Sequence, residues 1–324
     1  MTAKRRMKRP PPAQICARGN FSVRGGREEG VFDKKPLFRA LSDGFLPLIL
    51  RYNDLCAGGA EDVMARKIVI TSGKGGVGKT TVAANLGMNL SLLGARVALV
   101  DVDFGLNNLD VVMGIENKVV YDINDVLEGR CRVKQALVQD NGHKNLYVLP
   151  SDNLRATSAV TGQNLKAVTE NLSPLFDYLL LDCPAGVDAG FHRAVSCADE
   201  AILVSTPCFS SLRDADKVVS ILKSYKLEKI SLVANRVRGD LVAVEKTLSP
   251  KDMESLLKIP LIGVLPDEDD VMLYGAGFSP ASRIGRAFRI LARNVEEDTR
   301  RIYDATARYT GFFGQIKRGL RRSV

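Results

Sequence analysis

A glycine-rich phosphate-binding motif constrains this 324-residue chain more than any other feature of its sequence. The run Gly73-Lys-Gly-Gly-Val-Gly-Lys-Thr80 fits G-x-x-x-x-G-K-[ST], and it lies between the apolar run Ile68–Thr71 and a helix-like segment at 81–86. In such a unit the glycines let backbone N–H groups turn toward phosphates, and the helix N-terminus adds positive potential. A glycine-rich turn that only joins strand to helix is the alternative, but the complete motif in this context favours a nucleotide site.

The motif predicts which residues hold the nucleotide. Lys79 is expected to reach the β- and γ-phosphates, and the Thr80 hydroxyl is expected to bind Mg²⁺. The predicted phosphate-binding residues are the motif and the residue after it: Gly73, Lys74, Gly75, Gly76, Val77, Gly78, Lys79, Thr80 and Thr81. The expected ligand is therefore a nucleotide with Mg²⁺.

Strand and helix patterns alternate along the chain from residue 66. The strands are expected at 67–71, 95–101, 145–149, 178–182, 200–205, 230–235 and 261–265. The helices are expected at 79–93, 161–173, 187–198, 211–225, 249–257 and 282–302. Near-continuous apolar runs such as Tyr178–Leu181 suit strands that are buried on both faces. We expect an α/β fold of the P-loop NTPase kind, a single domain with a doubly wound, mostly parallel sheet and helices on both faces.

Two further strands end in carboxylates. Asp182 ends one strand and is predicted to be the Walker B acid, which holds Mg²⁺ through water. Asp101 and Asp103 end another, and their alternate spacing directs both to one face. In an open parallel sheet, ligands bind beyond the carboxyl ends of the strands, so these acids should lie near the phosphate loop. The alternative is that each is only a helix cap or a turn residue.

The net charge of +9 is concentrated at the two ends of the chain. Residues 1–63 carry +5 and residues 283–324 carry +7, whereas residues 64–282 carry −3. A basic balance usually indicates nucleic acid or anionic lipid, but here it does not belong to the central body. No apolar run approaches the roughly 18 residues that a membrane-spanning helix needs, which argues against an integral membrane protein.

These patterns divide the chain into three parts. Residues 1–63 lack periodicity and are expected to be a disordered extension; the methionine at Met64 suggests that the natural start lies there. Residues 64–303 should form the nucleotide-binding domain. Residues 304–324 should form a linker and a short basic amphipathic helix. The tail's expected apolar arc consists of Tyr309, Phe312, Phe313, Ile316, Leu320 and Val324, opposite the basic residues Lys317, Arg318, Arg321 and Arg322.

Such a tail suits an anionic membrane surface, with each basic group contributing about 1 kcal/mol. Three glycines, at Gly311, Gly314 and Gly319, weaken it as a helix in water, so it is expected to fold on lipid. The alternatives are a last helix that packs on the domain, or nonspecific binding of nucleic acid by the same charges.

Lys74, the second residue of the loop, is not required by the general motif, and Lys74–Thr81 resembles the deviant Walker A motif of the ParA/MinD ATPase family. The resemblance covers roughly 64–324 and is strongest to the septum-site-determining, MinD-type members. Further matching segments, in this order, are 101–110, 119–122, 135–137, 145–150, 181–186, 198–201, 212–216 and 235–236.

The resemblance implies roles for particular residues. Lys74 would cross to the nucleotide of a second subunit in an ATP-bound homodimer, and Asp103 would orient the attacking water, so the implied catalytic residues are Lys74, Lys79 and Asp103. Asn235 and Arg236 fall where the family contacts adenine, with Asp267 as a further candidate. A helix used for partner proteins is matched by Arg213, Asp214 and Asp216, which could equally be a solvated helix face.

The chain departs from the family pattern at Asn107, in the segment after Arg155, and at Phe278–Pro280. These loops flank the nucleotide and partner surfaces, so the departures put the identity of partners in doubt rather than ATP binding.

The expected function is that of a Mg²⁺-dependent ATPase that positions the division site. ATP would drive dimerisation and attachment to anionic lipid on the inner face of the cell membrane, and hydrolysis would release a cytoplasmic form. The implied partners are a division inhibitor and an activator of the MinC and MinE type, with no specific nucleic acid. The alternatives are a ParA-like DNA-partitioning or flagellar-number ATPase, which the net charge of 64–282 disfavours, and a binding scaffold without turnover.

Overall fold

The computed structural model describes residues 64–104, 108–151 and 160–311, which all belong to the compact unit Ala60–Val324. The expectations for 1–63, for Asn107 and for the segment after Arg155 lie outside the described residues. The same holds for the tail residues predicted to bind lipid, from Phe312 to Arg322.

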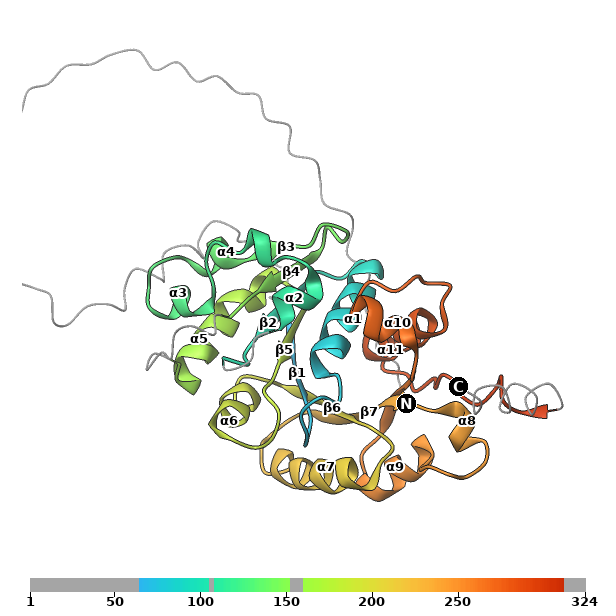
Figure 1. Cartoon of the computed structure of the whole chain (residues 1–324). Coiled ribbons are helices and arrows are strands. Elements are labelled where there is room, and N and C mark those ends of the chain that lie inside the picture. Colours follow the sequence, from blue (N-terminus) through green and yellow to red (C-terminus); the bar gives the residue numbers. More distant parts are fainter. Residues whose placement is uncertain (1–63, 105–107, 152–159, 312–324) are drawn as a thin grey trace, which may run out of the picture. The chain divides into compact units, whose positions relative to one another are not determined.

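The described strands form one eight-stranded sheet in the order β3-β4-β2-β5-β1-β6-β7-β8 (Figure 1). All neighbours pair in parallel except β3 and β4. The strands are β1 (Arg66–Thr71), β2 (Val97–Asp101), β3 (Val138–Gln139), β4 (Leu146–Leu149), β5 (Tyr178–Asp182), β6 (Glu200–Ser205), β7 (Lys229–Val237) and β8 (Leu261–Pro266). The seven predicted strands and the doubly wound parallel sheet are confirmed; β3 was missed because two residues carry no periodic signal.

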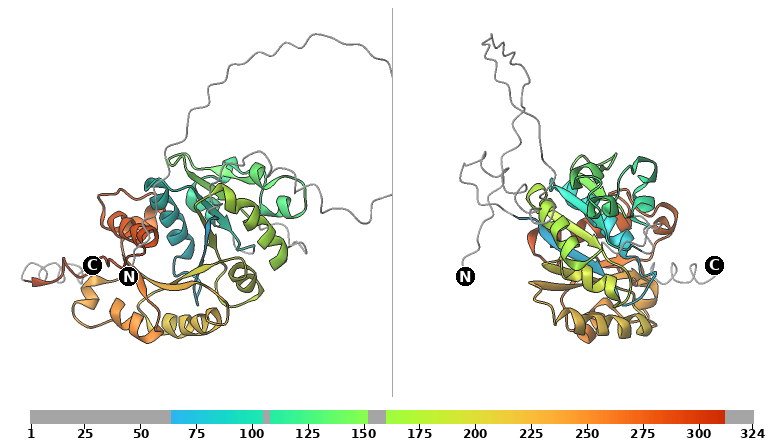
Figure 2. Two further views of the ribbon diagram at one scale, coloured as in Figure 1. Left: turned by 180° about the vertical axis from the view of Figure 1, so that it is seen from behind. Right: turned by 90° about the vertical axis from the view of Figure 1, so that its left-hand side faces the viewer.

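Helices cover both faces of the sheet, as Figure 2 shows from two further directions. One face carries α1 (Lys79–Leu92), α2 (Leu109–Met113) and α11 (Arg283–Glu297). The other face carries α3 (Ile123–Leu127), α4 (Val133–Ala136), α5 (Gly162–Leu172), α6 (Ala189–Val195), α7 (Phe209–Leu222) and α9 (Pro250–Leu257). Alternate strand residues point into the two hydrophobic cores. Ile68 and Ile70 pack in the core beneath α1 and α11, and Val69 packs in the core on the opposite face. Burial on both faces explains the near-continuous apolar strands.

Short elements were not anticipated. They are α2, α3, α4, α8 (Gly239–Val242), α10 (Asp269–Tyr274) and two 3-10 turns at Glu116–Lys118 and Ser173–Leu175. None is longer than six residues, too short for a helical period to appear in the sequence.

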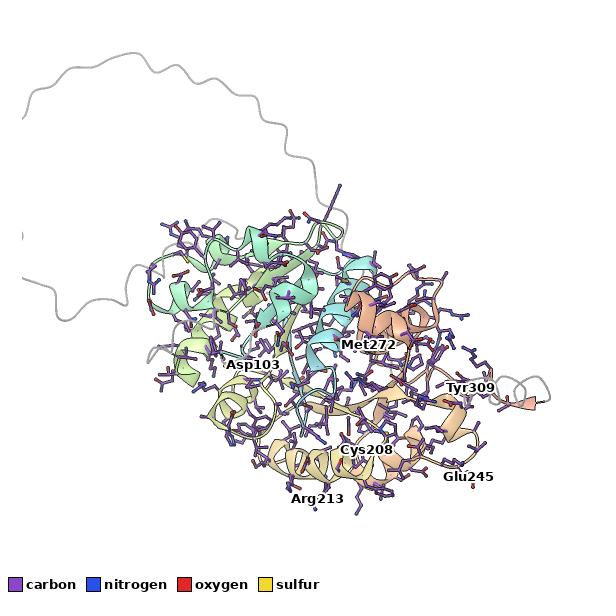
Figure 3. The ribbon with its side chains drawn as sticks, in the orientation of Figure 1. Asp103, Cys208, Arg213, Glu245, Met272 and Tyr309 are labelled. Atoms are coloured by element: carbon purple, nitrogen blue, oxygen red, sulfur yellow. The ribbon has the colours of Figure 1, made fainter. Side chains whose placement is uncertain are left out.

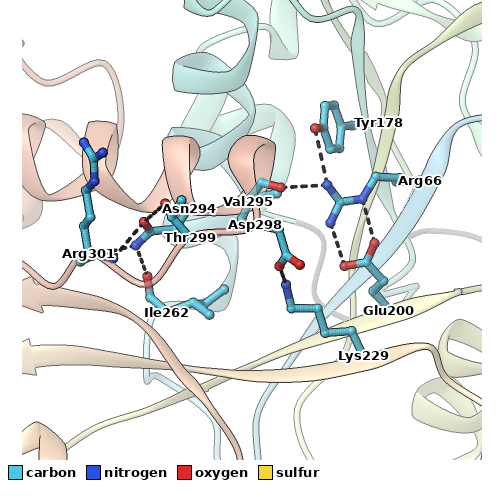
Figure 4. A network of polar contacts seen from close by, with 10 residues as sticks. All are labelled: Arg66, Tyr178, Glu200, Lys229, Ile262, Asn294, Val295, Asp298, Thr299 and Arg301. Atoms are coloured by element: carbon cyan, nitrogen blue, oxygen red, sulfur yellow. Dashed lines mark hydrogen bonds and ion pairs between the residues drawn. The ribbon is translucent and has the colours of Figure 1, made fainter. Parts of the chain in front are cut away.

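Helix α11 ends five residues before the predicted 302, because the chain turns back at Asp298, whose φ is 53°. The buried side chain of Asn294 closes this turn. Its Nδ2 donates to the carbonyls of Ile262 (2.8 Å) and Arg301 (2.6 Å), and its Oδ1 accepts from the Thr299 hydroxyl (2.7 Å; Figure 4). A single buried amide thus joins the helix end to β8 and fixes the direction of the following chain.

A second network in Figure 4 joins the amino ends of three strands to α11. The Arg66 guanidinium of β1 donates to both carboxylate oxygens of Glu200 on β6, at 2.6 and 2.8 Å, and to the Val295 carbonyl at 2.6 Å. It also lies 5.4 Å from the ring centroid of Tyr178 on β5, whose hydroxyl donates to Glu296. This bidentate ion pair is shielded from water and holds the helix across the sheet.

Tyr309 differs from the expectation for the tail. It was assigned to the tail's lipid-facing arc, but it is only 3% exposed. Around it, the segment that follows α11 lies against α8, and a Cβ on Gly239 would meet the Ala305 carbonyl oxygen at 1.9 Å. Tyr309 therefore belongs to the packed domain, and a lipid-binding arc can begin only after it. Among the described helices, none is both long and apolar enough to cross a bilayer.

We expect the substitution Glu200→Ala to destabilise the fold by about 2 kcal/mol, because it leaves the half-buried Arg66 guanidinium without its charged partner. The midpoint and slope of urea unfolding measure this. The matched control is Glu170→Ala, which removes an exposed ion pair with Lys166 and should cost less than about 0.5 kcal/mol. Equal losses in the two variants would contradict a structural role for the Arg66 network.

Candidate nucleotide site

The phosphate loop runs from the end of β1 into α1, as the motif predicts. Gly78 adopts a left-handed conformation (φ 93°), and its carbonyl accepts the N–H of Val82 as the helix begins. Lys79, at the first position of the helix, is 9% exposed, whereas Lys74 is exposed. A mostly buried lysine at a helix N-terminus is a favourable site for an anion. The predicted loop residues 73–81 therefore lie together.

Two distant elements hold the loop in shape. A Cβ on Gly73 would lie 2.3 Å from the backbone carbonyl carbon of Asp214, so the loop packs directly on the backbone of α7. On the other side, the buried amide of Asn235 at the end of β7 donates to the Val77 carbonyl at 2.7 Å. Gly73 is thus required for close approach, a separate reason from the phosphate contacts expected of it.

The strand-end acids converge beside this loop. Asp101 and Asp182 are register partners on β2 and β5, and Asp182 is also the register partner of Ile70 on β1. Both carboxylates are buried, and Asp101 Oδ2 and Asp182 Oδ1 have no hydrogen-bond partner among the described residues. Buried oxygens without protein partners are rare and are commonly satisfied by a water molecule or an ion. Together with the Thr80 hydroxyl, this oxygen-rich donor set fits a hydrated Mg²⁺ ion.

Burial sets the protonation of these acids. Loss of solvent raises the pKa of Asp182 to about 6, against the opposing effects of hydrogen bonding by Thr80 and of the Lys79 charge. Loss of solvent, followed by repulsion from Asp182, raises the pKa of Asp101 well above its ordinary value. A cation between the two carboxylates would remove this penalty, because it favours the ionised forms.

Asp103 lies just beyond β2 and is half-buried. Its backbone N–H donates to Asp101 Oδ1 at 3.0 Å, and its carbonyl accepts the Ser151 hydroxyl at 3.5 Å. Its charge also acts on Asp182, so the two acids share one neighbourhood. The structure therefore brings Asp103 to the predicted site, with Asp101 as the residue that fixes its backbone.

The candidate adenine residues lie at the far side of the loop. Strand β7 is bulged between Ala234 and Val237, and Arg236 there has a left-handed backbone (φ 54°) and an exposed side chain. The side-chain amide N–H of Asn235 already donates to the Val77 carbonyl of the loop. Asp267 follows β8 and lines a cavity of about 350 Å³ with Val237 and Pro266. Figure 3 labels Asp103 and Cys208, which follow the carboxyl ends of β2 and β6.

The positions assigned to a partner helix lie in α7. Arg213 and Asp216 are exposed and Asp214 is half-exposed. The Asp214 backbone contacts Gly73 of the phosphate loop, and Asp214 directly follows the exposed Arg213. A protein bound at Arg213 would therefore lie close to the phosphate loop.

Sequence reasoning did not assign Asp101 a role. Its signal was its position at a strand end, but its proximity to Asp182 follows from the pairing of β2 with β5, which no local pattern encodes. The arrangement can hold a polyphosphate against backbone N–H groups and a lysine, hold a divalent cation on hydroxyl and carboxylate oxygens, and present a further carboxylate to a water molecule.

The comparisons with known proteins agree with this geometry. Residues 68–277 match the CobQ/CobB/MinD/ParA nucleotide binding domain. The chain is similar to the septum site-determining protein MinD of Synechocystis sp., with 42% identity over 263 residues that cover 79% of this chain and 99% of that protein.

Solved structures give the same result. A chain of the MinC:MinD cell division protein complex of Aquifex aeolicus superposes with a TM-score of 0.68 at 38% identity, covering 72% of this chain and 97% of that chain. MinD of Pyrococcus horikoshii, complexed with Mg-ADP, superposes with a TM-score of 0.64 at 32% identity and the same two coverages.

The raised pKa of Asp182 predicts a stability that depends on pH. Between its unfolded value of 3.8 and about 6, the folded state keeps a proton that the unfolded chain has lost, so this group's contribution to stability falls as pH rises through that window. Without Mg²⁺ and nucleotide, Asp182→Asn should therefore be more stable than the wild type at pH 7.5, on the order of 2 kcal/mol, with the gap closing toward pH 4.

Thermal or urea unfolding at several pH values tests this. The control is Asp270→Asn, which neutralises an exposed carboxylate and should leave the difference from the wild type unchanged across the same range. A wild-type protein at least as stable as Asp182→Asn at pH 7.5 would refute the prediction.

Proposed function

This chain belongs to the CobQ/CobB/MinD/ParA nucleotide-binding family, and within it to the septum-site-determining MinD proteins, and we propose that it is a Mg²⁺-dependent ATPase. We propose further that its nucleotide state controls its attachment to the membrane. ATP joins two subunits, the paired C-terminal tails bind anionic lipid, and hydrolysis releases the protein to the cytoplasm. The observation that carries the proposal is the convergence of the phosphate loop with Asp101, Asp103 and Asp182 at one edge of the sheet.

The loop and the buried lysine account for binding. Backbone N–H groups of the loop and the N-terminus of α1 would hold the phosphates, and the mostly buried Lys79 would add a positive charge. Thr80 and Asp182 would hold Mg²⁺, Asp182 through water. Bound there, Mg²⁺ neutralises charge that develops on the phosphate oxygens.

Two residues would act on hydrolysis itself. Asp103 lies at the edge of the site with its backbone held by Asp101, where its carboxylate can orient a water molecule for in-line attack on the γ-phosphate. Lys74, the second residue of the loop, is exposed and so accessible to a second subunit, whose nucleotide it would contact. Activity would then require the dimer.

Partner proteins of the MinC and MinE type would bind at α7. The support is the contact between Gly73 and the Asp214 backbone, through which a partner on the exposed Arg213 and Asp216 could shift the phosphate loop. The MinC:MinD complex of the Aquifex relative supports a MinC-type partner for this chain.

The most direct test substitutes Lys74. We expect Lys74→Ala to keep nucleotide binding, because Lys79 and the loop backbone remain, but to lose lipid-stimulated ATP hydrolysis by about 100-fold, as expected when one charge that stabilises the transition state is removed. Phosphate release with anionic liposomes and binding of a fluorescent ATP analogue give the two readouts. Lys79→Ala is the contrasting variant and should lose nucleotide binding as well. Lipid-stimulated turnover by Lys74→Ala at the wild-type rate would refute the proposed role.

A second test removes the tail without disturbing the fold. A chain that ends at Gly311 keeps the buried Tyr309 and should lose flotation with anionic liposomes in ATP while keeping its unfolding midpoint. A chain that ends at Arg308 also loses Tyr309 and should be less stable by about 2 kcal/mol, the value of one buried aromatic side chain. Undiminished flotation of the chain that ends at Gly311 would exclude the tail as the membrane anchor.

A further inference from the structure

Three adjacent apolar side chains at the end of α10 are exposed. Met272, Leu273 and Tyr274, which we call the α10 tip, are 90%, 71% and 69% exposed. Single exposed apolar residues are ordinary on protein surfaces, but a contiguous group of large ones indicates an interaction site. The proposed nucleotide chemistry does not use them.

The α10 tip is held in a defined position. Val271, directly before it, packs on the core. Directly after it, the buried amide of Asn85 on α1 donates to the Gly275 carbonyl at 3.2 Å and accepts the Gly277 N–H at 3.1 Å. The ring of Phe278 then stacks on Phe288 of α11, with centroids 5.9 Å apart. These contacts present the apolar side chains to solvent on a fixed support.

A row of arginines lies on the neighbouring helix. Arg286, Arg289 and Arg293 of α11, which we call the α11 row, recur at helical spacing on the exposed side of this helix. None of the three forms an ion pair with another described residue. The N-terminal ends of the two helices are tied by the ion pair between Arg283 and Glu268. The acidic residues described near the row are Asp269 and Asp270 in the first turn of α10, Glu296 and Glu297 in the last turn of α11, and Asp267, Glu268 and Asp304, which line the cavity at the start of the row.

The chain reaches its C-terminal tail beside this row. Arg286 and Arg308 line the same cavity, so the segment after α11 runs past the start of the row. In the left view of Figure 2, the orange-red α10 and α11 and the red chain that leads to residue 311 lie on the same side of the unit. The last described residues of the chain therefore lie near the start of the α11 row.

We propose that the α10 tip and the α11 row form a second lipid-binding surface, which lies on the anionic bilayer when the tail attaches the protein. The tip would enter the headgroup region, and the row would contact lipid phosphates. The inference rests on the proposed membrane attachment and deepens it: the body itself contacts lipid and is thereby held in one orientation.

Charge favours an anionic bilayer on this surface over the chain's own tail or a second copy of the chain. The tail's own residues 312–324 carry four basic and no acidic side chains, and a second copy of α11 would present the same arginines, so either would meet like charges. An anionic bilayer complements the row and accepts the apolar tip. Two attachment points on one body also increase the overall affinity without stronger individual contacts.

The absence of tryptophan from the chain allows a direct test. Leu273→Trp would place a single tryptophan in the α10 tip. The matched control is Leu256→Trp, at an exposed leucine of α9 that lies away from α10 (Figure 1). With Mg²⁺, ATP and phosphatidylglycerol vesicles that carry brominated acyl chains, we expect the emission of Leu273→Trp to shift to the blue and to be quenched, and that of Leu256→Trp to stay unchanged.

The outcomes separate this inference from the proposed function. Flotation of both variants without quenching of Leu273→Trp would overturn the second surface and leave tail attachment intact. Failure of both to float would overturn membrane attachment and the surface together. A spectral change of Leu273→Trp with duplex DNA, or on self-association without lipid, in place of the change with vesicles would assign the surface to that other partner.

The α11 row is tested by charge. Replacing Arg286, Arg289 and Arg293 with glutamine should weaken binding to the vesicles by about fivefold per arginine, equivalent to about 1 kcal/mol each. The control variant carries glutamine in place of the exposed Lys223, Lys226 and Lys251, which changes the net charge by the same amount. Its affinity for the vesicles should fall much less. Equal losses in the two triple variants would overturn the row as a specific lipid contact.

Discussion

The burial of two carboxylates against the phosphate loop is the constraint on which this structure depends. Asp101 and Asp182 end adjacent strands and are nearly inaccessible to water, and one oxygen of each has no hydrogen-bond partner within the described part of the chain. Ionisation of both acids is unfavourable without a bound cation, because desolvation and mutual repulsion both oppose it. The cost is consistent with a site built for a cation and a polyphosphate, whose charges would stabilise the ionised acids. The sheet supplies the rigid frame, because both acids are part of its register.

The same loop is the point where distant parts of the fold meet. Gly73 touches the backbone of α7, and Asn235 of β7 holds the Val77 carbonyl, so neither element can move without the loop. On the opposite edge of the sheet, Arg66 and Asn294 fasten α11 to the strands. The carboxyl ends of the strands therefore carry the candidate nucleotide site, and their amino ends are held to α11 by hydrogen bonds. The α10 tip is held separately, by Asn85 of α1 and by the stacking of Phe278 on Phe288.

Much of the fold could be predicted because it depends on local pattern. Each strand with a continuous apolar run was recognised, since burial on both faces excludes polar residues from it. The predicted end of α11 was too late, because the polar residues of its last turn do not interrupt the helical pattern of the sequence. The helix ends at Glu297 because the side chain of Asn294 donates to the carbonyls of Ile262 and Arg301 and so turns the chain. The position of Tyr309 was wrong for a related reason: an aromatic residue next to a basic segment fits an amphipathic tail equally well until the contact with the α8 region is known.

The sequence by itself determined the phosphate loop, the strand-end acids and the nucleotide-binding family, because motif spacing and hydrophobic period are properties of neighbouring residues. Only the tertiary structure decided that Asp101 faces Asp182, that Gly73 must be glycine to approach α7, that Tyr309 is part of the domain, and that an apolar tip lies beside a row of arginines. Each of these facts joins residues far apart in the chain. Strand order and helix packing create them, and no local pattern of residues encodes either one.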